Sequence, residues 1–143
     1  MKVLVIRFGA MGDLVHLSPS FRALNNQHPG VTIDLLTSAI YQPIVNNFDA
    51  LNQSLFWDKK DGLPALFQLA VQLAGERYDA VINLHPSLKT GLFCLLLRAS
   101  KTAVYRKERL RVTGSQQRTM TRRHAVEDFY SVFQRALDRK SVV

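Results

Sequence analysis

Short apolar runs alternate with amphipathic stretches along most of the chain. The runs are rich in Val, Ile and Leu, as strands buried on both faces of a parallel sheet are, and they predict five strands, at residues 2–8, 31–37, 51–57, 79–84 and 102–106. Apolar residues at helical spacing predict helices at 13–27, 41–48, 63–77 and 88–99, and a last one at about 126–137. Strands that alternate with helices favour right-handed crossovers. The pattern therefore predicts an α/β, Rossmann-like parallel sheet of about five strands with helices on both faces.

Three segments modify this pattern. Proline fits the first turn of a helix but disrupts its interior, so we expect the helix at 13–27 to restart or kink at Pro19, with Ser18 as a cap. Residues 59–62 form a polar stretch, which predicts a loop before the next helix. Residues 108–123 have the weakest pattern and are rich in Arg, Thr, Gln and Ser, which predicts a mobile loop.

The size and composition fit one soluble domain. A chain of 143 residues with 47% hydrophobic residues can build a single core. The longest apolar stretch in a predicted helix, at 92–97, is far shorter than the roughly 18 residues of a membrane span. Arg7 and Gly9 interrupt the first apolar run too early for a secretory signal, so we expect a cytoplasmic protein. The single cysteine, Cys94, lies in an apolar run and is expected to be a buried, inert thiol.

The positive charge is concentrated in one segment. Residues 98–123 contain nine basic side chains and one acid, Glu108, and this excess accounts for the whole net charge of +8. A local field of this kind favours an anionic partner, such as phosphates on a ligand, an acidic membrane surface or nucleic acid. A solvated basic loop without a partner is the alternative interpretation.

A glycine-containing loop that ends in a carboxylate follows the first predicted strand. Gly9, Gly12 and Asp13 stand where the carboxyl edge of an open α/β sheet holds its ligands. Glycines let a ligand approach the backbone, and a helix N-terminus stabilises a nearby negative charge. Asp13 is therefore either a site residue or a helix cap, and the loop alone leaves both interpretations open.

The sequence lacks the features of several common cofactor sites. The loop reads G-x-x-G-D rather than G-x-G-x-x-G, and Asp34 falls inside the second strand rather than at its end, which disfavours a dinucleotide. Residues 1–143 contain no P-loop sequence and no zinc-ligand spacing. We therefore expect no bound cofactor and no metal.

Three sequence segments resemble one enzyme family. Residues 2–19, KVLVIRFGAMGDLVHLSP, are similar to the opening of the bacterial ADP-heptose:lipopolysaccharide heptosyltransferases and their relatives in glycosyltransferase family 9. Residues 83–90, NLHPSLKT, and 124–127, HAVE, are similar to later motifs of the same family. The three matches occur in the family's order and span nearly the whole chain.

The resemblance implies a fold and an activity. Family members have two Rossmann-like domains in the GT-B arrangement, and this chain resembles the N-terminal, acceptor-binding one. We therefore expect residues 1–143 to form a single acceptor-binding domain, without the C-terminal half that mainly binds the nucleotide sugar. In the family, the aspartate of the G-D pair is the general base of an inverting transfer, which gives this role to Asp13. The implied donor is a nucleotide sugar such as ADP-heptose.

The resemblance also implies acceptor-binding residues and partners. Besides Asp13, the candidates are Gly9, Met11, Gly12, His16, His85 and Lys89. His16 lies one helical turn after Asp13, although a packing or surface histidine is an equal alternative. Asn83 and Lys89 stand where the family often has Asp and Arg, and lysine lacks arginine's bidentate geometry. The implied partner is the phosphorylated inner core of lipopolysaccharide, with peripheral association at the anionic inner-membrane surface.

Two functions from other classes remain open. The chain could be a binding module without catalysis, which holds an anionic glycan or a nucleotide. It could also bind nucleic acid through residues 98–123, with an affinity that falls steeply as salt rises. Tyr105 is the only aromatic residue of that segment, which disfavours stacking on single strands.

Overall fold

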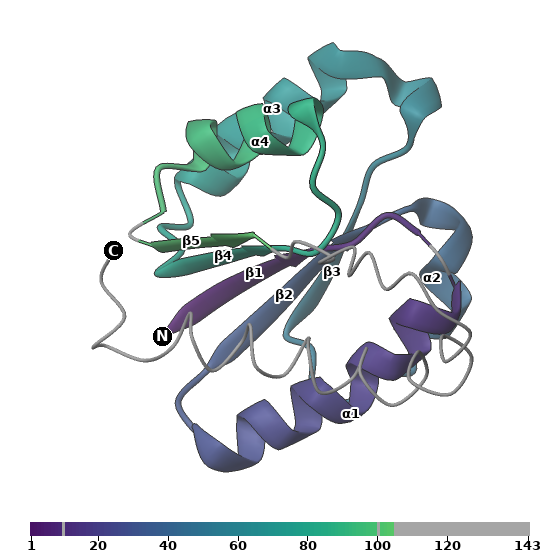
Figure 1. The fold of residues 1–143 in the computed structure, drawn as a ribbon, viewed down its shortest axis with the longest axis vertical. Helices are drawn as coiled ribbons and strands as arrows, with labels where there is room; N and C mark the ends of the chain where they lie inside the picture. Colours follow the sequence, from purple (N-terminus) through teal and green to yellow (C-terminus); the bar gives the residue numbers. More distant parts are fainter. Residues whose placement is uncertain (10, 100, 105–143) are drawn as a thin grey trace, which may run out of the picture.

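The centre of the fold is a five-stranded parallel sheet in the order β3-β2-β1-β4-β5 (Figure 1). The computed structural model describes residues 1–9, 11–99 and 101–104. The strands are β1 (Lys2–Ile6), β2 (Thr32–Thr37), β3 (Gln53–Phe56), β4 (Ala80–Asn83) and β5 (Lys101–Val104). In register, Ile6 of β1 lies beside Leu36 of β2 and Asn83 of β4. The carboxyl ends of the three central strands are therefore level with one another.

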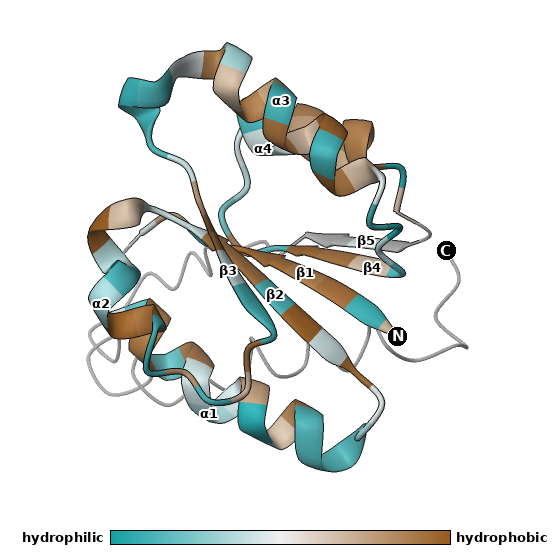
Figure 2. Ribbon diagram, turned by 180° about the vertical axis from the view of Figure 1, so that it is seen from behind, coloured by the Kyte–Doolittle hydropathy of each residue, from teal (hydrophilic) through white to brown (hydrophobic). Residues whose placement is uncertain are grey.

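Helices cover both faces of the sheet. The helix α1 (Met11–Gln27), the short turn η1 (Ala39–Tyr41) and α2 (Gln42–Val45) lie on one face, and η2 (Lys59–Asp61), α3 (Gly62–Ala74) and α4 (Leu88–Leu97) lie on the other (Figure 1). Alternate residues of each strand point to opposite faces. Accordingly, Val3 and Val5 pack in the core under α1, whereas Leu4 and Ile6 pack under α3 and α4. Figure 2 shows the resulting apolar centre of the sheet.

The alternation of strands and helices predicted from the sequence is confirmed, with shifts at the element ends. The helix expected at 41–48 is a single turn of α-helix after a 3-10 turn, and the loop expected at 59–62 contains the turn η2. Cys94 is buried as expected, and this burial raises the pKa of its thiol to about 11. The helix expected at 126–137, the loop at 108–123 and most of the basic segment lie outside the described residues.

The expected restart of the first helix at Pro19 is wrong. α1 runs without a break from Met11 to Gln27, with Pro19 inside it. A proline in a helix interior costs about 3 kcal/mol or more. Leu14 and Leu17 before it, and Phe21 and Leu24 after it, are all fully buried against the sheet. Because each such side chain contributes about 1.5–3 kcal/mol when buried, packing on both sides of Pro19 outweighs the local cost.

Asp34 is a buried structural residue. Its Oδ1 accepts a hydrogen bond from Asn52 at 2.9 Å, and its Oδ2 accepts bonds from Gln53 at 2.9 Å and from the Tyr78 hydroxyl at 2.6 Å. Burial and this hydrogen bond to Asp34 raise the pKa of the Tyr78 hydroxyl. Asp34 thus joins the interior of β2 to the start of β3 and to the segment before β4.

Candidate functional site

The site predicted after β1 lies where the strand connections diverge. β1 sits between β2 and β4, and the chain leaves β1 for α1 on one face but leaves β4 for α4 on the other (Figure 1). In open α/β sheets this change of direction opens a crevice at the carboxyl ends of the strands, where ligands bind. The backbone links its two sides, because the Arg7 amide donates to the Leu36 carbonyl and the Leu84 amide donates to the Ile6 carbonyl, both at 3.0 Å.

Arg7 joins three elements at this point. Its Nη2 donates to Oδ2 of Asp13 in an ion pair, and its Nη1 donates to the backbone carbonyl of Leu84 at 2.6 Å. The Arg7 side chain is 15% exposed, whereas that of Asp13 is 36% exposed. The mostly buried Arg7 side chain therefore binds the Asp13 carboxylate from within the fold, and the carboxylate remains accessible to solvent.

Asp13 lies inside the first turn of α1. A capping residue precedes the first helical residue, whereas Asp13 comes two residues after it. Its position allows the helix dipole to stabilise its negative charge, and its carboxylate is directed to Arg7. The structure thus places Asp13 just after the carboxyl end of β1, with its carboxylate oriented by Arg7.

His85 lies on the loop after β4, at the same carboxyl edge of the sheet. Its ring packs edge-to-face on Phe8, with 5.9 Å between ring centroids, and Phe8 packs in the same way on Trp57 at 5.4 Å. Partial burial lowers the pKa of His85 below its usual 6.5, and the charges of Arg7 and Lys59 lower it further. The lowered pKa favours the neutral imidazole, which can both donate and accept a hydrogen bond.

A small polar network fixes the His85 loop. Ser87 caps α4: its Oγ accepts from the Thr90 amide at 3.2 Å, and Thr90 Oγ1 accepts from the Ser87 amide at 2.8 Å. Buried Asn83 donates to Thr90 Oγ1 at 3.0 Å, and its Oδ1 accepts from the His85 amide at 3.1 Å. Asn83, which stands where the resembling family often has an acid, thus holds the loop in this structure.

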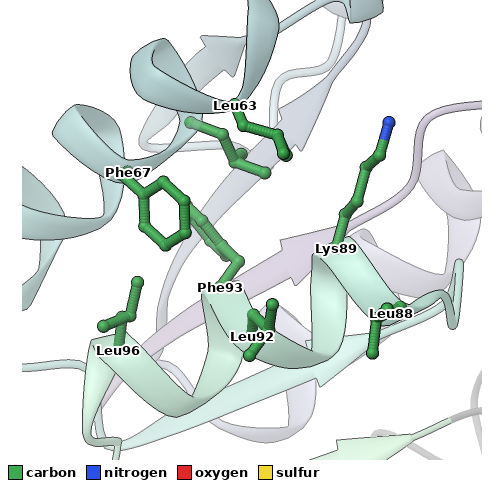
Figure 3. A pocket seen from close by; sticks show the side chains of 8 residues that line it. Leu63, Phe67, Leu88, Lys89, Leu92, Phe93 and Leu96 are labelled. Carbon is green, nitrogen blue, oxygen red and sulfur yellow. The ribbon is translucent and has the colours of Figure 1, made fainter.

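The other predicted acceptor-binding residues are less closely grouped. Gly9, Met11 and Gly12 surround the turn into α1; Met11 is exposed, and a Cβ added at either glycine would meet nothing within 4 Å. His16 is exposed on α1, one turn beyond Asp13. Lys89 lies on α4, where it lines a groove between α3 and α4 (Figure 3). The structure therefore gathers Asp13 and His85 around Arg7 and places Lys89 on a separate surface.

Sequence reasoning missed the roles of Arg7, Phe8 and Trp57. It treated Arg7 only as an interruption of the first apolar run. The sequence did contain an indication of this role. Arg7 directly follows a buried strand, so its long side chain lies at the same edge of the sheet as the Asp13 carboxylate six residues later. The stacking of Phe8 on Trp57 and His85 joins three loops that are distant in sequence, and no local pattern indicates it.

Several solved glycosyltransferase structures resemble this one. A family 9 glycosyl transferase from Veillonella parvula DSM 2008 matches with a TM-score of 0.75 and 20% identity over 99% of this chain and 43% of that chain. ADP-heptose lps heptosyltransferase II of E. coli matches with a TM-score of 0.64 and 24% identity over 73% of this chain and 30% of that chain. E. coli heptosyltransferase WaaC with ADP-2-deoxy-2-fluoro heptose matches with a TM-score of 0.72 and 19% identity over 96% and 48%.

These similarities concern the fold. No protein-family model and no curated protein sequence matches the chain. The chain spans less than half the length of each of the three solved structures. The α/β, Rossmann-like architecture predicted from the sequence is confirmed, and it agrees with the resemblance seen in the sequence motifs. The chain therefore has a fold that it shares with a solved family 9 glycosyl transferase and with solved heptosyltransferases.

Proposed function

We propose that the chain is the acceptor-binding part of an inverting glycosyltransferase. In this proposal a heptose or related sugar moves from a nucleotide sugar, such as ADP-heptose, to the phosphorylated inner core of lipopolysaccharide. The acceptor is a membrane component, so the protein would work in the cytoplasm at the inner-membrane surface. The shared fold and the order of the three sequence motifs support this assignment.

The ion pair between Arg7 and Asp13 is the observation that carries the proposal. It supports the proposal because an oriented, accessible carboxylate at the carboxyl edge of an α/β sheet stands where such sheets bind ligands. The imidazole of His85, near enough to Arg7 for its charge to lower the histidine pKa, would offer a hydrogen bond to a second hydroxyl. Together these groups can bind and orient a sugar.

Asp13 would act as the general base. The acceptor hydroxyl attacks the anomeric carbon of the donor sugar, a new carbon–oxygen bond forms, and the bond to the nucleoside diphosphate breaks. The hydroxyl proton passes to the Asp13 carboxylate, and the leaving diphosphate takes the electron pair of the broken bond. Arg7 holds Asp13 in position throughout. Stabilising the leaving diphosphate would be the task of a separate donor-binding part, and this chain covers less than half of each similar solved chain.

Substitution at Asp13 tests this role. In the longest form that the gene encodes, Asp13→Asn is expected to lower transfer from ADP-heptose to de-acylated inner-core acceptor by about 100-fold or more, because general-base catalysis contributes about that factor. Acceptor affinity, measured by calorimetry, is expected to change little because asparagine keeps the shape. Asp49→Asn is the matched control, since Asp49 is an exposed acid paired with Arg22 on the surface.

Two results would contradict the proposal. Sugar transfer at a near-normal rate by the Asp13→Asn variant would show that Asp13 is not the general base. Acceptor binding by the wild-type protein without any transfer would identify a binding module for an anionic glycan instead.

A further inference from the structure

The outer face of α3 and α4 is strongly apolar and exposed. Of the eleven exposed large hydrophobic residues in the described part of the chain, seven lie on these two helices. Leu88 is 83% exposed, and Val71 and Leu95 are each 73% exposed. Figure 2 shows the apolar colouring on this helix pair. A concentration of this kind marks a surface that is covered by a partner.

The two helices form a shallow groove. Leu63 and Phe67 of α3 face Leu92 and Leu96 of α4 across a cavity of about 170 Å³ (Figure 3). Lys89 stands at one end of the groove, and its amino group extends beyond the apolar side chains. The groove can accept hydrocarbon, while the lysine amine reaches a polar layer above it.

The charge within this face is positive, whereas the segments that border it carry both signs. α3 has 13 residues and α4 has 10, and Lys89 is the only charged residue in either helix. The exposed cations Lys59 and Lys60 come just before α3, and exposed Arg98 follows α4. Acids border the face as well: Asp58 and exposed Asp61 form the reciprocal capping box of η2, and exposed Glu76 after α3 pairs with Lys2. Lys89, inside the groove, is therefore the cation that gives this face its positive charge.

Exposed Leu and Phe side chains bordered by Lys and Arg match the interface of an anionic bilayer. The apolar residues enter the boundary between headgroups and acyl chains, and the cations meet the anionic headgroups. None of the helices in the described ranges is long and apolar enough to cross a membrane. We propose that the α3 and α4 face docks on an anionic lipid bilayer.

The position of this face relates it to the candidate site. α3 and α4 follow β3 and β4, so both helices begin at the carboxyl edge of the sheet that also holds Arg7 and Asp13. Docking through this face would hold the crevice close to the headgroup layer. The link to a lipid-anchored acceptor rests on the proposed function, whereas the docking itself does not.

Vesicle flotation of the 143-residue chain tests the docking. The wild-type chain is expected to float with vesicles of equal parts phosphatidylcholine and phosphatidylglycerol, and much less with phosphatidylcholine alone. Leu88→Ser/Leu95→Ser is expected to lower the partition coefficient by about tenfold or more, because two leucines lose their burial in the bilayer. Lys89→Glu is expected to lower it by about tenfold, since each cation near an anionic surface adds to binding.

Ile40→Ser is the matched control. Ile40 is 76% exposed but belongs to η1, on the other face of the sheet, so its substitution is expected to leave flotation unchanged. Thermal unfolding followed by circular dichroism verifies that each variant is folded. Transfer to de-acylated acceptor in solution needs no membrane, so that assay separates failure of the proposed function from failure of docking.

Three results would overturn the docking proposal. The first is a wild-type chain that does not float with anionic vesicles. The second is equal flotation of the wild type and the folded Leu88→Ser/Leu95→Ser variant. The third is a wild-type dimer in sedimentation that the double substitution dissociates, without any vesicle binding, which would identify the face as a contact between protein chains.

Discussion

Nη2 of Arg7 donates to Oδ2 of Asp13, so the residue that ends the first strand orients the carboxylate in the first turn of the following helix. The same guanidinium also reaches the Leu84 carbonyl after β4. One side chain thus connects both sides of the crevice, and four predictions follow from this site and the surrounding fold.

Arg7→Gln is expected to lower the free energy of unfolding by about 1–2 kcal/mol, because it removes two part-buried hydrogen bonds, one of them to a carboxylate. Urea denaturation measures this change. Arg22→Gln is the control, since the pair of Arg22 with Asp49 is solvent-exposed and contributes less than about 1 kcal/mol. Equal losses in the two variants would mean that Arg7 has no special role in joining the elements.

His85 is expected to make the fold less stable as the pH falls below neutral. Its pKa in the folded protein lies below the usual 6.5, so the unfolded chain binds the proton more tightly. The contribution of neutral His85 to stability is fully present above pH 6.5. It is lost as the pH falls from 6.5 through the pKa that His85 has in the folded protein. The midpoint of the His85 ring titration by NMR is expected below 6.5 and is expected to rise in Arg7→Gln. An unchanged midpoint in this variant would contradict the contribution of the Arg7 charge.

Asp34→Asn is expected to cost about 1–3 kcal/mol of stability while leaving acceptor binding unchanged. Asp34 accepts hydrogen bonds from Asn52, Gln53 and Tyr78, and an amide replaces one of its acceptor oxygens with a donor. Denaturation and calorimetry measure the two effects. A change in acceptor affinity without a change in stability would show that this cluster is not purely structural.

Cys94 is expected to resist alkylation in the folded protein. Its thiol is buried, and burial raises its pKa to about 11, so little thiolate is present or accessible at pH 8. Mass spectrometry after brief treatment with iodoacetamide is expected to show modification only in denaturant. Because the chain has one cysteine, any alkylated cysteine that mass spectrometry detects is Cys94. Fast modification without denaturant would indicate that α4 opens readily from the sheet.

The fold could be predicted from the sequence to a large extent because its signals are local. The apolar run before Arg7 and the helical spacing from Leu63 onward each indicate the correct element, and the glycine loop locates the sheet edge. Pro19 misled the prediction because local helix preference ignores the burial of Leu17 and Phe21 on either side of it.

The candidate site was less predictable because its contacts are distant in sequence. Asp13 could be identified from the G-D pair, but its partnership with Arg7 depends on how the chain turns from strand to helix. Lys89 could be placed at the start of α4, yet the direction of its side chain follows from the packing of α3 on α4. Such contacts arise from the tertiary structure, and no periodic pattern of residues in the sequence indicates them.

The edge-to-face contacts of Phe8 with His85 and Trp57 give the crevice its own optical signal. Trp57 is the only tryptophan in the chain, and its indole donates to the Gly62 carbonyl at 3.0 Å, where α3 begins. In the proposed function a sugar hydrogen-bonds to His85, which touches Trp57 through Phe8, so binding is expected to change the surroundings of this one fluorophore. Emission from the unmodified protein can therefore report occupancy of the crevice without any label.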